Sequence, residues 1–381
     1  MAMGINTDQV VQDCFNAIRD KIQNLTTLNI IVAGKTGVGK STLINSVFRE
    51  DLAETGMGRP VTTHMRRISK KDFPLVVYDT RGFELGKSVQ EDVKDEVMKT
   101  IRDGLASNDI SKAIHCIWYC INAASNRIEP EEIEWIRELG AKNEVAQVPI
   151  IVVLTQCFSK KKAQEMRKAI GDENLNVVQI VPVLAQDYEI DENYVAKAFG
   201  LDVLIRVMSQ ALPDELLDTL QNLQKVSLDE KTKRAQAAVA AATAAAAAAG
   251  ATPIPIADCA VLIPTQVAMI ASIAVIFGVD VNKTVLASFV SSVLGSGGAT
   301  LLGKTVVTNL LKLIPGAGSL AGGAISAGTA GLLTTALGET FILVMIRIYK
   351  GELSTKDLES SSGKKLINAI FRDRLRRLGR R

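Results

Sequence analysis

The chain has 381 residues, enough for two or three domains, and its 47% hydrophobic content argues against disorder. Its 44 basic and 41 acidic residues nearly cancel to a net charge of +3, so the overall charge favours no class of partner. The five cysteines form no C-x-x-C pair and the two histidines lie far apart. This pattern excludes a disulfide framework and a zinc site of the usual spacing, and it suits a reducing cytosol.

Residues 1–26 lack the charged and then apolar layout of a signal peptide. Their apolar side chains recur instead at the spacing of a helix face, as in Val11, Cys14, Phe15, Ile18 and Ile22. We therefore predict an amphipathic helix that docks onto another part of the protein, with membrane contact as the alternative.

Residues 34–41 match the phosphate-loop pattern G-x-x-x-x-G-K-[ST] without a gap, between a strand-like run and a helix-like run. The glycines let backbone N–H groups turn toward a phosphate chain, and the helix adds its N-terminal donors. Lys40 would reach the β- and γ-phosphates, and the Ser41 hydroxyl would hold Mg²⁺. The residues predicted to bind nucleotide here are Gly34, Lys35, Thr36, Gly37, Val38, Gly39, Lys40, Ser41 and Thr42.

A second functional stretch follows the apolar run 74–78, where the chain reads Asp79-Thr80-Arg81-Gly82. An Asp at the carboxyl end of a strand, with Gly three residues later, is typical of a site that holds Mg²⁺ through water and senses a γ-phosphate. Residues 50–63 between the two stretches are rich in Gly, Pro and Thr and are predicted to form a loop.

Together, residues 34–41, the Thr-bearing loop 60–63 and residues 79–82 resemble the translation-factor-related class of P-loop GTPases over roughly residues 28–212. The phosphate loop is most similar to those of the septin, immunity-related and chloroplast-import branches. The resemblance implies an α/β fold, a mainly parallel sheet with helices on both faces, that binds GTP and GDP with Mg²⁺. It also implies that Thr63, with Thr62 as the alternative, completes the Mg²⁺ shell, and that Lys40, Thr63 and Gly82 act in hydrolysis.

The chain departs from this class at Phe83, where many members carry a Gln that orients water. A phenyl ring cannot hydrogen-bond a water molecule. GTPases with such a substitution commonly rely on a group supplied elsewhere, often across a dimer. We expect slow hydrolysis by the monomer, with Arg59, Arg81 and Glu84 as loop charges that could contribute.

The second departure concerns the base. Guanine specificity in this class normally comes from Asn/Thr-Lys-x-Asp, but residues 155–158 read Thr-Gln-Cys-Phe, and Asp187 is the alternative acceptor. Strand 177–183 leads to a loop in which Ala185 would present a backbone N–H to the base. The predicted base-binding residues are Thr155, Gln156 and Ala185, and the choice between guanine and adenine stays open. A helix over 195–212 is expected to close the domain.

The composition changes abruptly after residue 234, and residues 262–279 carry no charge, which is the lower limit for crossing a bilayer. Small residues repeat at four-residue spacing within 316–331, as in helices packed closely in lipid. Membrane insertion or reversible membrane association is predicted, with a soluble apolar bundle as the alternative. On residues 251–255, Asp258 and Gln266, this half also resembles a poorly understood bacterial domain, associated with membranes, that follows small GTPase domains. Asp258, Gln266 and Lys283 would find partners inside it.

Residues 364–381 predict a basic amphipathic helix suited to an anionic lipid surface, with RNA as the alternative ligand. The sequence thus divides into an N-terminal helix (1–26), a GTPase domain (27–212), a helical linker (213–234), a hydrophobic helical domain (235–350) and a basic tail (351–381). We expect a Mg²⁺-dependent GTPase that acts as a switch in the cytoplasm, at or in the cytoplasmic membrane. Its expected partners are guanine nucleotide, membrane lipids and a second copy bound through the GTPase domain, and no DNA. The alternatives are a nucleotide-binding scaffold without hydrolysis and a soluble RNA- or ribosome-associated GTPase.

Overall fold

The computed structural model describes residues 7–50, 52, 57–60, 64–80, 87–125, 127–249, 254–255, 262–279, 281–294, 324–325 and 327–380. The chain forms two compact units. One, called here the sheet unit, is Leu25–Glu230, and the other, the helical unit, combines Met1–Asn24 with Lys231–Arg381. Thr63, Gly82, Asp258 and most of 316–331 lie outside the described residues.

The sheet unit is built on a seven-stranded sheet in the order β2-β3-β4-β1-β5-β6-β7. Strands β4, β1, β5, β6 and β7 pair in parallel, whereas β3 pairs antiparallel with both β4 and β2. The predicted mainly parallel sheet is confirmed. The strands are β1 (Leu28–Ala33), β2 (Met57–Pro60), β3 (Met65–Lys70), β4 (Phe73–Thr80), β5 (Cys116–Asn122), β6 (Ile150–Thr155) and β7 (Gln179–Pro182).

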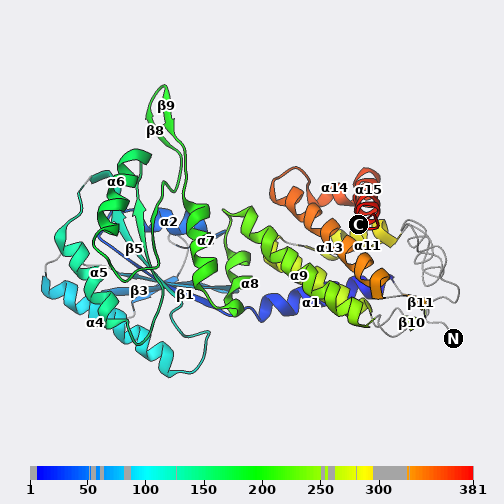
Figure 1. The fold of residues 1–381 in the computed structure, drawn as a ribbon, viewed down its shortest axis with the longest axis horizontal. Coiled ribbons are helices and arrows are strands. Elements are labelled where there is room, and N and C mark those ends of the chain that lie inside the picture. Colours follow the sequence, from blue (N-terminus) through cyan, green and yellow to red (C-terminus); the bar gives the residue numbers. More distant parts are fainter. Residues whose placement is uncertain are drawn as a thin grey trace. The chain divides into compact units, whose positions relative to one another are not determined.

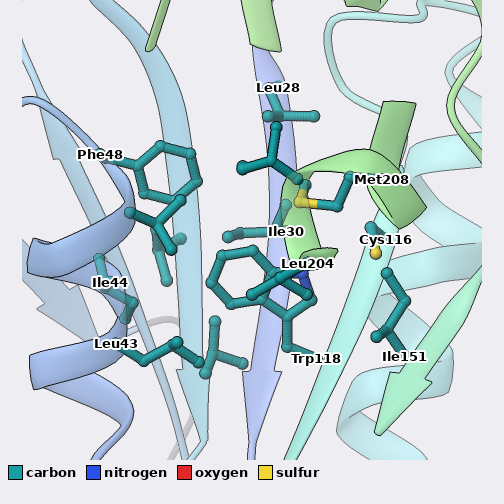
Figure 2. Packing of buried hydrophobic residues seen from close by; sticks show 14 of the residues in the cluster. Leu28, Ile30, Leu43, Ile44, Phe48, Cys116, Trp118, Ile151, Leu204 and Met208 are labelled. Atoms are coloured by element: carbon teal, nitrogen blue, oxygen red, sulfur yellow. The ribbon is translucent and has the colours of Figure 1, made fainter. Parts of the chain in front are cut away.

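Helices cover both faces of this sheet because successive residues of a strand point to opposite sides. On one face, Leu28, Ile30 and Val32 of β1 pack in a core with α2, α7 and α8 (Figure 2). On the other face, Ile31 and Ala33 share a core with α4, α5 and α6. The helices are α2 (Lys40–Val47), α4 (Lys87–Ala106), α5 (Pro130–Lys142), α6 (Lys160–Gly171), α7 (Leu201–Ala211) and α8 (Asp214–Leu223), with a 3₁₀ turn η1 (Ala123–Ser125).

Two predicted boundaries need correction. The segment 213–234 is not a separate linker, because Leu216, Leu220 and Leu223 of α8 belong to the core of the sheet unit. The predicted helix over 195–212 begins only at Leu201, after Gly200 caps it with a left-handed φ of 86°. Before that glycine the chain forms a hairpin of β8 (Tyr188–Asp191) and β9 (Tyr194–Ala196), which extends away from the sheet in Figure 1.

A buried histidine, His115, joins the starts of β1 and β5. Its Nδ1 accepts a hydrogen bond from the Asn29 N–H at 2.9 Å, and its Nε2 lies 2.8 Å from the Ile110 carbonyl oxygen. Burial lowers the pKa of His115, although the Ile110 carbonyl acts in the opposite direction. The native state therefore excludes a proton that the unfolded chain takes up near the ordinary pKa of about 6.5.

We predict that the sheet unit loses stability as the pH falls below about 6.5, because the unfolded state then binds more protons than the native state. The stabilisation is fully present above that pH. Urea unfolding at several pH values measures this effect, and tryptophan fluorescence reports on the sheet unit because Trp118 and Trp135 are the chain's two tryptophans. The variant His115→Asn should show a shallower decline. An equally steep decline in the variant would contradict the assignment.

The helical unit contains α1, part of α9 and the helices that follow. α1 packs against α10 and α11, as an amphipathic docking helix would, and α10 and α15 both pack against α13. Its elements are α1 (Thr7–Gln23), α9 (Leu228–Ala249), which begins in the sheet unit, β10 (Ile254–Pro255), α10 (Leu262–Phe277), α11 (Lys283–Leu294), β11 (Ala324–Ile325), α13 (Ala327–Tyr349), α14 (Thr355–Glu359) and α15 (Ser361–Leu378).

In the described part of the chain, one helix, α13, is long and apolar enough to cross a bilayer. It has 23 residues, and 67% of its most apolar window is buried inside the structure. The 16 residues of α10 rise only about 24 Å, short of a hydrocarbon core of roughly 30 Å. A buried core helix of a soluble protein passes the same test as α13.

The structure corrects one prediction for the basic tail, which concerns the apolar face of its helix α15. Ile367, Phe371 and Leu375 of α15 are buried, and this helix packs against α11 and α13. Its apolar face is therefore covered by protein instead of being available to lipid. The basic side of the helix remains exposed at Lys364, Lys365, Arg372, Arg376 and Arg377.

Of the polar residues expected to find partners within the helical unit, the structure describes Gln266 and Lys283, and each has its own partner. Gln266 donates from Nε2 to the Thr334 hydroxyl at 3.3 Å. The Lys283 ammonium lies 5.1 Å from the centre of the Phe15 ring, a distance typical of a cation–π contact. Both contacts help to hold α10 and α11 in the unit.

Candidate nucleotide-binding site

The phosphate loop connects β1 to α2 through three glycines with positive φ. The φ angles are 137° at Gly34, 78° at Gly37 and 95° at Gly39, a region that favours glycine because it lacks a Cβ atom. Gly39 is also the N-cap of α2 and supplies no side-chain hydrogen bond. Gly39 therefore leaves the first N–H groups of α2 without a side-chain cap. An anion site at a helix N-terminus needs such uncapped donors.

Lys40 folds back across this loop. Its Nζ donates to the carbonyl oxygens of Gly34 at 2.8 Å and Lys35 at 2.9 Å. Within the described ranges Lys40 forms no ion pair with a carboxylate, so its charge is available to an anion. Lys35 differs, because its ammonium is paired with Glu129.

The other predicted phosphate-loop residues occupy two environments. Val38 is buried in the core beside α2, so its side chain supports the loop. Thr36, Ser41 and Thr42 are exposed at the loop and the first turn of α2. Their hydroxyl groups therefore lie on the side of the loop that solvent and a ligand can reach.

Asp79 lies near the carboxyl end of β4, paired in register with Val32 of β1. This pairing brings its half-buried carboxylate to the edge of the sheet from which the phosphate loop leaves. A carboxylate and the Ser41 hydroxyl are oxygen ligands of the kind that Mg²⁺ accepts together with water and substrate phosphates. The residues present thus fit a Mg²⁺ site shared with a nucleotide. No group of three or more His, Cys, Asp or Glu that could hold a metal by itself occurs among the described residues.

Thr155 and Gln156, predicted to bind the base, hold the phosphate loop through their side chains. The Thr155 hydroxyl lies 2.5 Å from the Val38 carbonyl oxygen and 3.1 Å from that of Ile121. Gln156 donates from Nε2 to the Gly37 carbonyl oxygen at 2.9 Å, with its own backbone at a left-handed φ of 54°. These contacts join the loop after β6 to the loop after β1.

An aromatic pair that the sequence did not indicate joins the loop after β6 to the start of β8. The ring of Phe158 lies 4.4 Å from that of Tyr188, centre to centre, at an angle of 45°. Tyr188 starts the hairpin β8–β9 and is 51% exposed. Its only signal in the sequence is the alternation of Tyr188 and Ile190 before a polar turn.

The carboxylate of Asp187, the alternative acceptor for the base, binds two residues that follow the hairpin β8–β9. Its Oδ2 pairs with the Lys197 ammonium at 2.8 Å, and its Oδ1 accepts from the Ala198 N–H at 2.8 Å. The hydrogen bond from Lys197 lowers the pKa of this carboxyl. The carboxylate is therefore held against its own hairpin.

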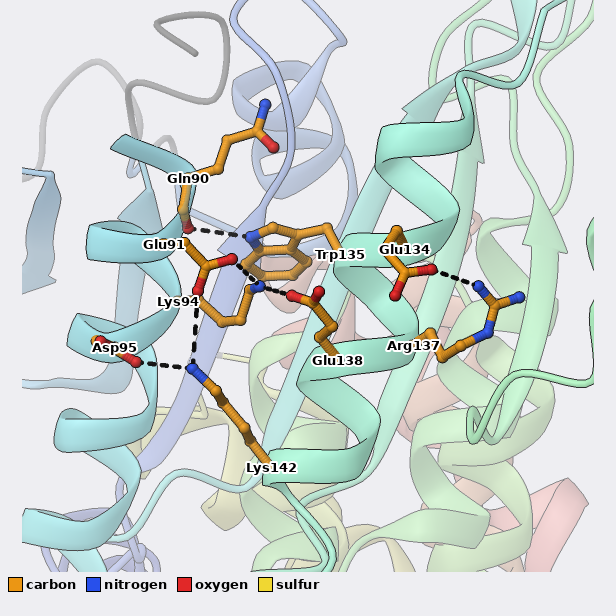
Figure 3. A network of polar contacts seen from close by, with 9 residues as sticks. All are labelled: Gln90, Glu91, Lys94, Asp95, Glu134, Trp135, Arg137, Glu138 and Lys142. Carbon is orange, nitrogen blue, oxygen red and sulfur yellow. Dashed lines mark hydrogen bonds and ion pairs between the residues drawn. The ribbon is translucent and has the colours of Figure 1, made fainter. Parts of the chain in front are cut away.

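Beside this site, a network of ion pairs fixes α4, the first described helix after Asp79, onto α5 (Figure 3). The side chain of Lys94 is only 2% exposed and is paired with Glu91 at 2.8 Å and with Glu138. Lys142 pairs with Asp95 at 2.8 Å. A buried ammonium is costly without partners, so this network favours one position of α4.

Comparisons with known proteins agree with this geometry. Residues 29–156 match the family model described as "50S ribosome-binding GTPase", and residues 214–372 match "Domain of unknown function (DUF697)". The second match includes the segment predicted as a linker and most of the basic tail.

Septins are among the similar proteins. Septin-1 of Drosophila melanogaster is 25% identical over 199 residues, covering 46% of this chain and 54% of that protein. Septin-4 of Homo sapiens is 28% identical over 186 residues, covering 42% of this chain and 38% of that protein. The chain thus spans about half or less of the septins' length. The crystal structure of Cdc11 from Saccharomyces cerevisiae aligns with a TM-score of 0.27 and 21% identity, over 44% of this chain and 70% of that chain. The chain therefore contains a GTP-binding P-loop GTPase domain, similar to those of septins, followed by a DUF697 domain of unknown function.

Proposed function

We propose that this protein is a Mg²⁺-dependent GTPase that acts as a switch, with its nucleotide domain controlling the helical unit at the cytoplasmic face of a membrane. The observation that carries the proposal is Lys40, whose ammonium lies over a glycine loop at the start of α2 and forms no ion pair with a carboxylate among the described residues. A cation and backbone donors placed together in this way suit a polyphosphate.

In the proposed reaction, water attacks the γ-phosphorus, the bond to the β–γ bridging oxygen breaks, and GDP leaves with the electron pair. Lys40 and the first N–H groups of α2 would stabilise negative charge on the phosphates. Ser41 and Asp79 would hold Mg²⁺, which when bound supplies further charge neutralisation. Thr63 and Gly82 keep their proposed roles in the metal shell and in sensing the γ-phosphate.

The proposal also includes pairing of GTPase domains. Phe83 offers no group that can orient a water molecule, so the missing function would come from a second copy or another partner. The membrane part of the proposal is supported by the length and composition of α13 and by the exposed basic residues of α15.

We predict slow GTP hydrolysis at low protein concentration and faster turnover per molecule at high concentration or on anionic liposomes. The measurement is phosphate release over a hundredfold range of protein concentration, with neutral liposomes as the control. A turnover that stays constant throughout would contradict activation by pairing. Binding of GTP without any phosphate release would favour a nucleotide-binding scaffold, and sedimentation with ribosomes instead of liposomes would contradict the membrane role.

A further inference from the structure

The topology of the sheet places a nucleotide base over the loops that follow β6 and β7. Ligands of open α/β sheets bind beyond the carboxyl ends of the strands, and the phosphate loop here follows β1. From β1 the sheet continues in the order β5, β6 and β7. The Gln156 side chain reaches Gly37, and the Cys157 N–H donates to the Val183 carbonyl oxygen at 3.2 Å. A base attached to phosphates at Lys40 therefore lies near Phe158 and Ala185.

These two loops hold no available carboxylate for the base. Residues 155–159 contain no Asp or Glu, and Asp187 is the sole acidic residue in 184–187. Lys197 and the Ala198 N–H each donate to one of its oxygens, which holds this carboxylate against its own hairpin. The N1–H and 2-amino groups of guanine are both donors, so the site lacks the charged acceptor that would distinguish guanine from hypoxanthine, which has no 2-amino group.

The loops do offer an aromatic surface and one donor. Phe158 is half-buried and is supported by Tyr188, which suits stacking against a purine ring. The backbone N–H of Ala185 donates to no acceptor within the described part of the chain. Such a donor complements the 6-oxo group of guanine or hypoxanthine and opposes the 6-amino group of adenine.

We propose that Phe158 and Tyr188 form a stacking platform for 6-oxopurine nucleotides, so that the site reads the 6-oxo group but not the 2-amino group. The protein would accept inosine triphosphate (ITP) as well as GTP. This inference rests on the proposed nucleotide-binding function. It gives Phe158 the stacking role and the Ala185 N–H the role of reading the 6-oxo group.

The test is a titration of the full-length protein with GTP, ITP and ATP in the presence of Mg²⁺. GTP and ITP should bind with affinities within about threefold of each other, and ATP should bind at least about tenfold more weakly, as expected for one lost hydrogen bond. A larger preference for GTP over ITP would overturn the inference while leaving the GTPase function intact. Equal binding of ATP would overturn the role of the Ala185 N–H. Failure of all three nucleotides to bind would overturn the proposed function and this inference with it.

Two substitutions at one position separate stacking from hydrogen bonding. Phe158→Asp supplies the missing acceptor and should create a preference for GTP over ITP of about tenfold or more, because hydrogen bonds to charged groups are strong. Phe158→Ala should weaken GTP and ITP alike by about tenfold, as loss of stacking predicts. An unchanged GTP to ITP ratio in Phe158→Asp, or unchanged affinities in Phe158→Ala, would overturn the placement of this ring beside the base.

Discussion

Replacing Lys40 by Ala should abolish GTP binding, with a loss of affinity of about a hundredfold or more. The Lys40 ammonium contacts only carbonyl oxygens of its own loop among the described residues, so its charge is available to the β- and γ-phosphates. Charge-assisted hydrogen bonds of this kind contribute about 1.5 to 3 kcal/mol each. Titration with a fluorescent GTP analogue measures the loss.

The matched control is Lys35→Ala in the same loop. Its ammonium is already paired with Glu129, and a surface ion pair contributes at most about 1 kcal/mol. We expect its GTP affinity to fall by less than about fivefold. Lys40→Ala with normal affinity, or Lys35→Ala with an equally large loss, would contradict the assignment of Lys40 as the phosphate-binding cation.

The first half of the fold follows from local patterns in the sequence. The phosphate loop requires a strand before it and a helix after it, and continuous apolar runs predict strands buried on both faces, such as β5 and β6. The position of Asp79 beside the phosphate loop is also predictable, because the carboxyl ends of parallel strands meet at one edge of a sheet. The structure confirms this arrangement by placing Asp79 opposite Val32 of β1.

The base side of the site was less predictable because it depends on contacts between separate segments. Nothing in the sequence around Phe158 indicates that Tyr188 will lie against its ring. The ion pair of Asp187 depends on Lys197, which lies ten residues later in the chain, just after the second strand of the hairpin. The sequence predicts a helix from residue 195, whereas Val195 and Ala196 belong to β9 and the helix begins at Leu201. Gly200, which delays the helix, is visible in the sequence only as one glycine among many.

The helical unit was difficult to predict for another reason. Apolar side chains such as Phe371 or Leu375 can cover lipid or protein, and the sequence alone does not distinguish these neighbours. In the structure, α15 places both residues against other helices of the unit. The apolar pattern therefore predicted correctly that this face of α15 is covered, but protein and not lipid covers it.

Gly34→Ala should destabilise the sheet unit strongly, by about 3 kcal/mol or more, through overpacking and backbone strain. A Cβ atom at this position would lie 2.4 Å from the carbonyl oxygen of Cys120, and the φ of Gly34 is 137°. Cys120 cannot easily move away, because it sits inside β5 between two neighbouring strands. The same clash would displace the phosphate loop, so nucleotide binding should fall together with stability.

Gly37→Ala provides the control, because a Cβ atom there would meet nothing within 4 Å and only its φ of 78° is unfavourable. We expect that variant to lose only about 1 to 2 kcal/mol, the usual cost of left-handed backbone for a residue with a side chain. Urea unfolding followed by tryptophan fluorescence compares the two, because both tryptophans lie in the sheet unit. Equal losses would show that backbone conformation, and not the contact with Cys120, makes glycine necessary at the end of β1.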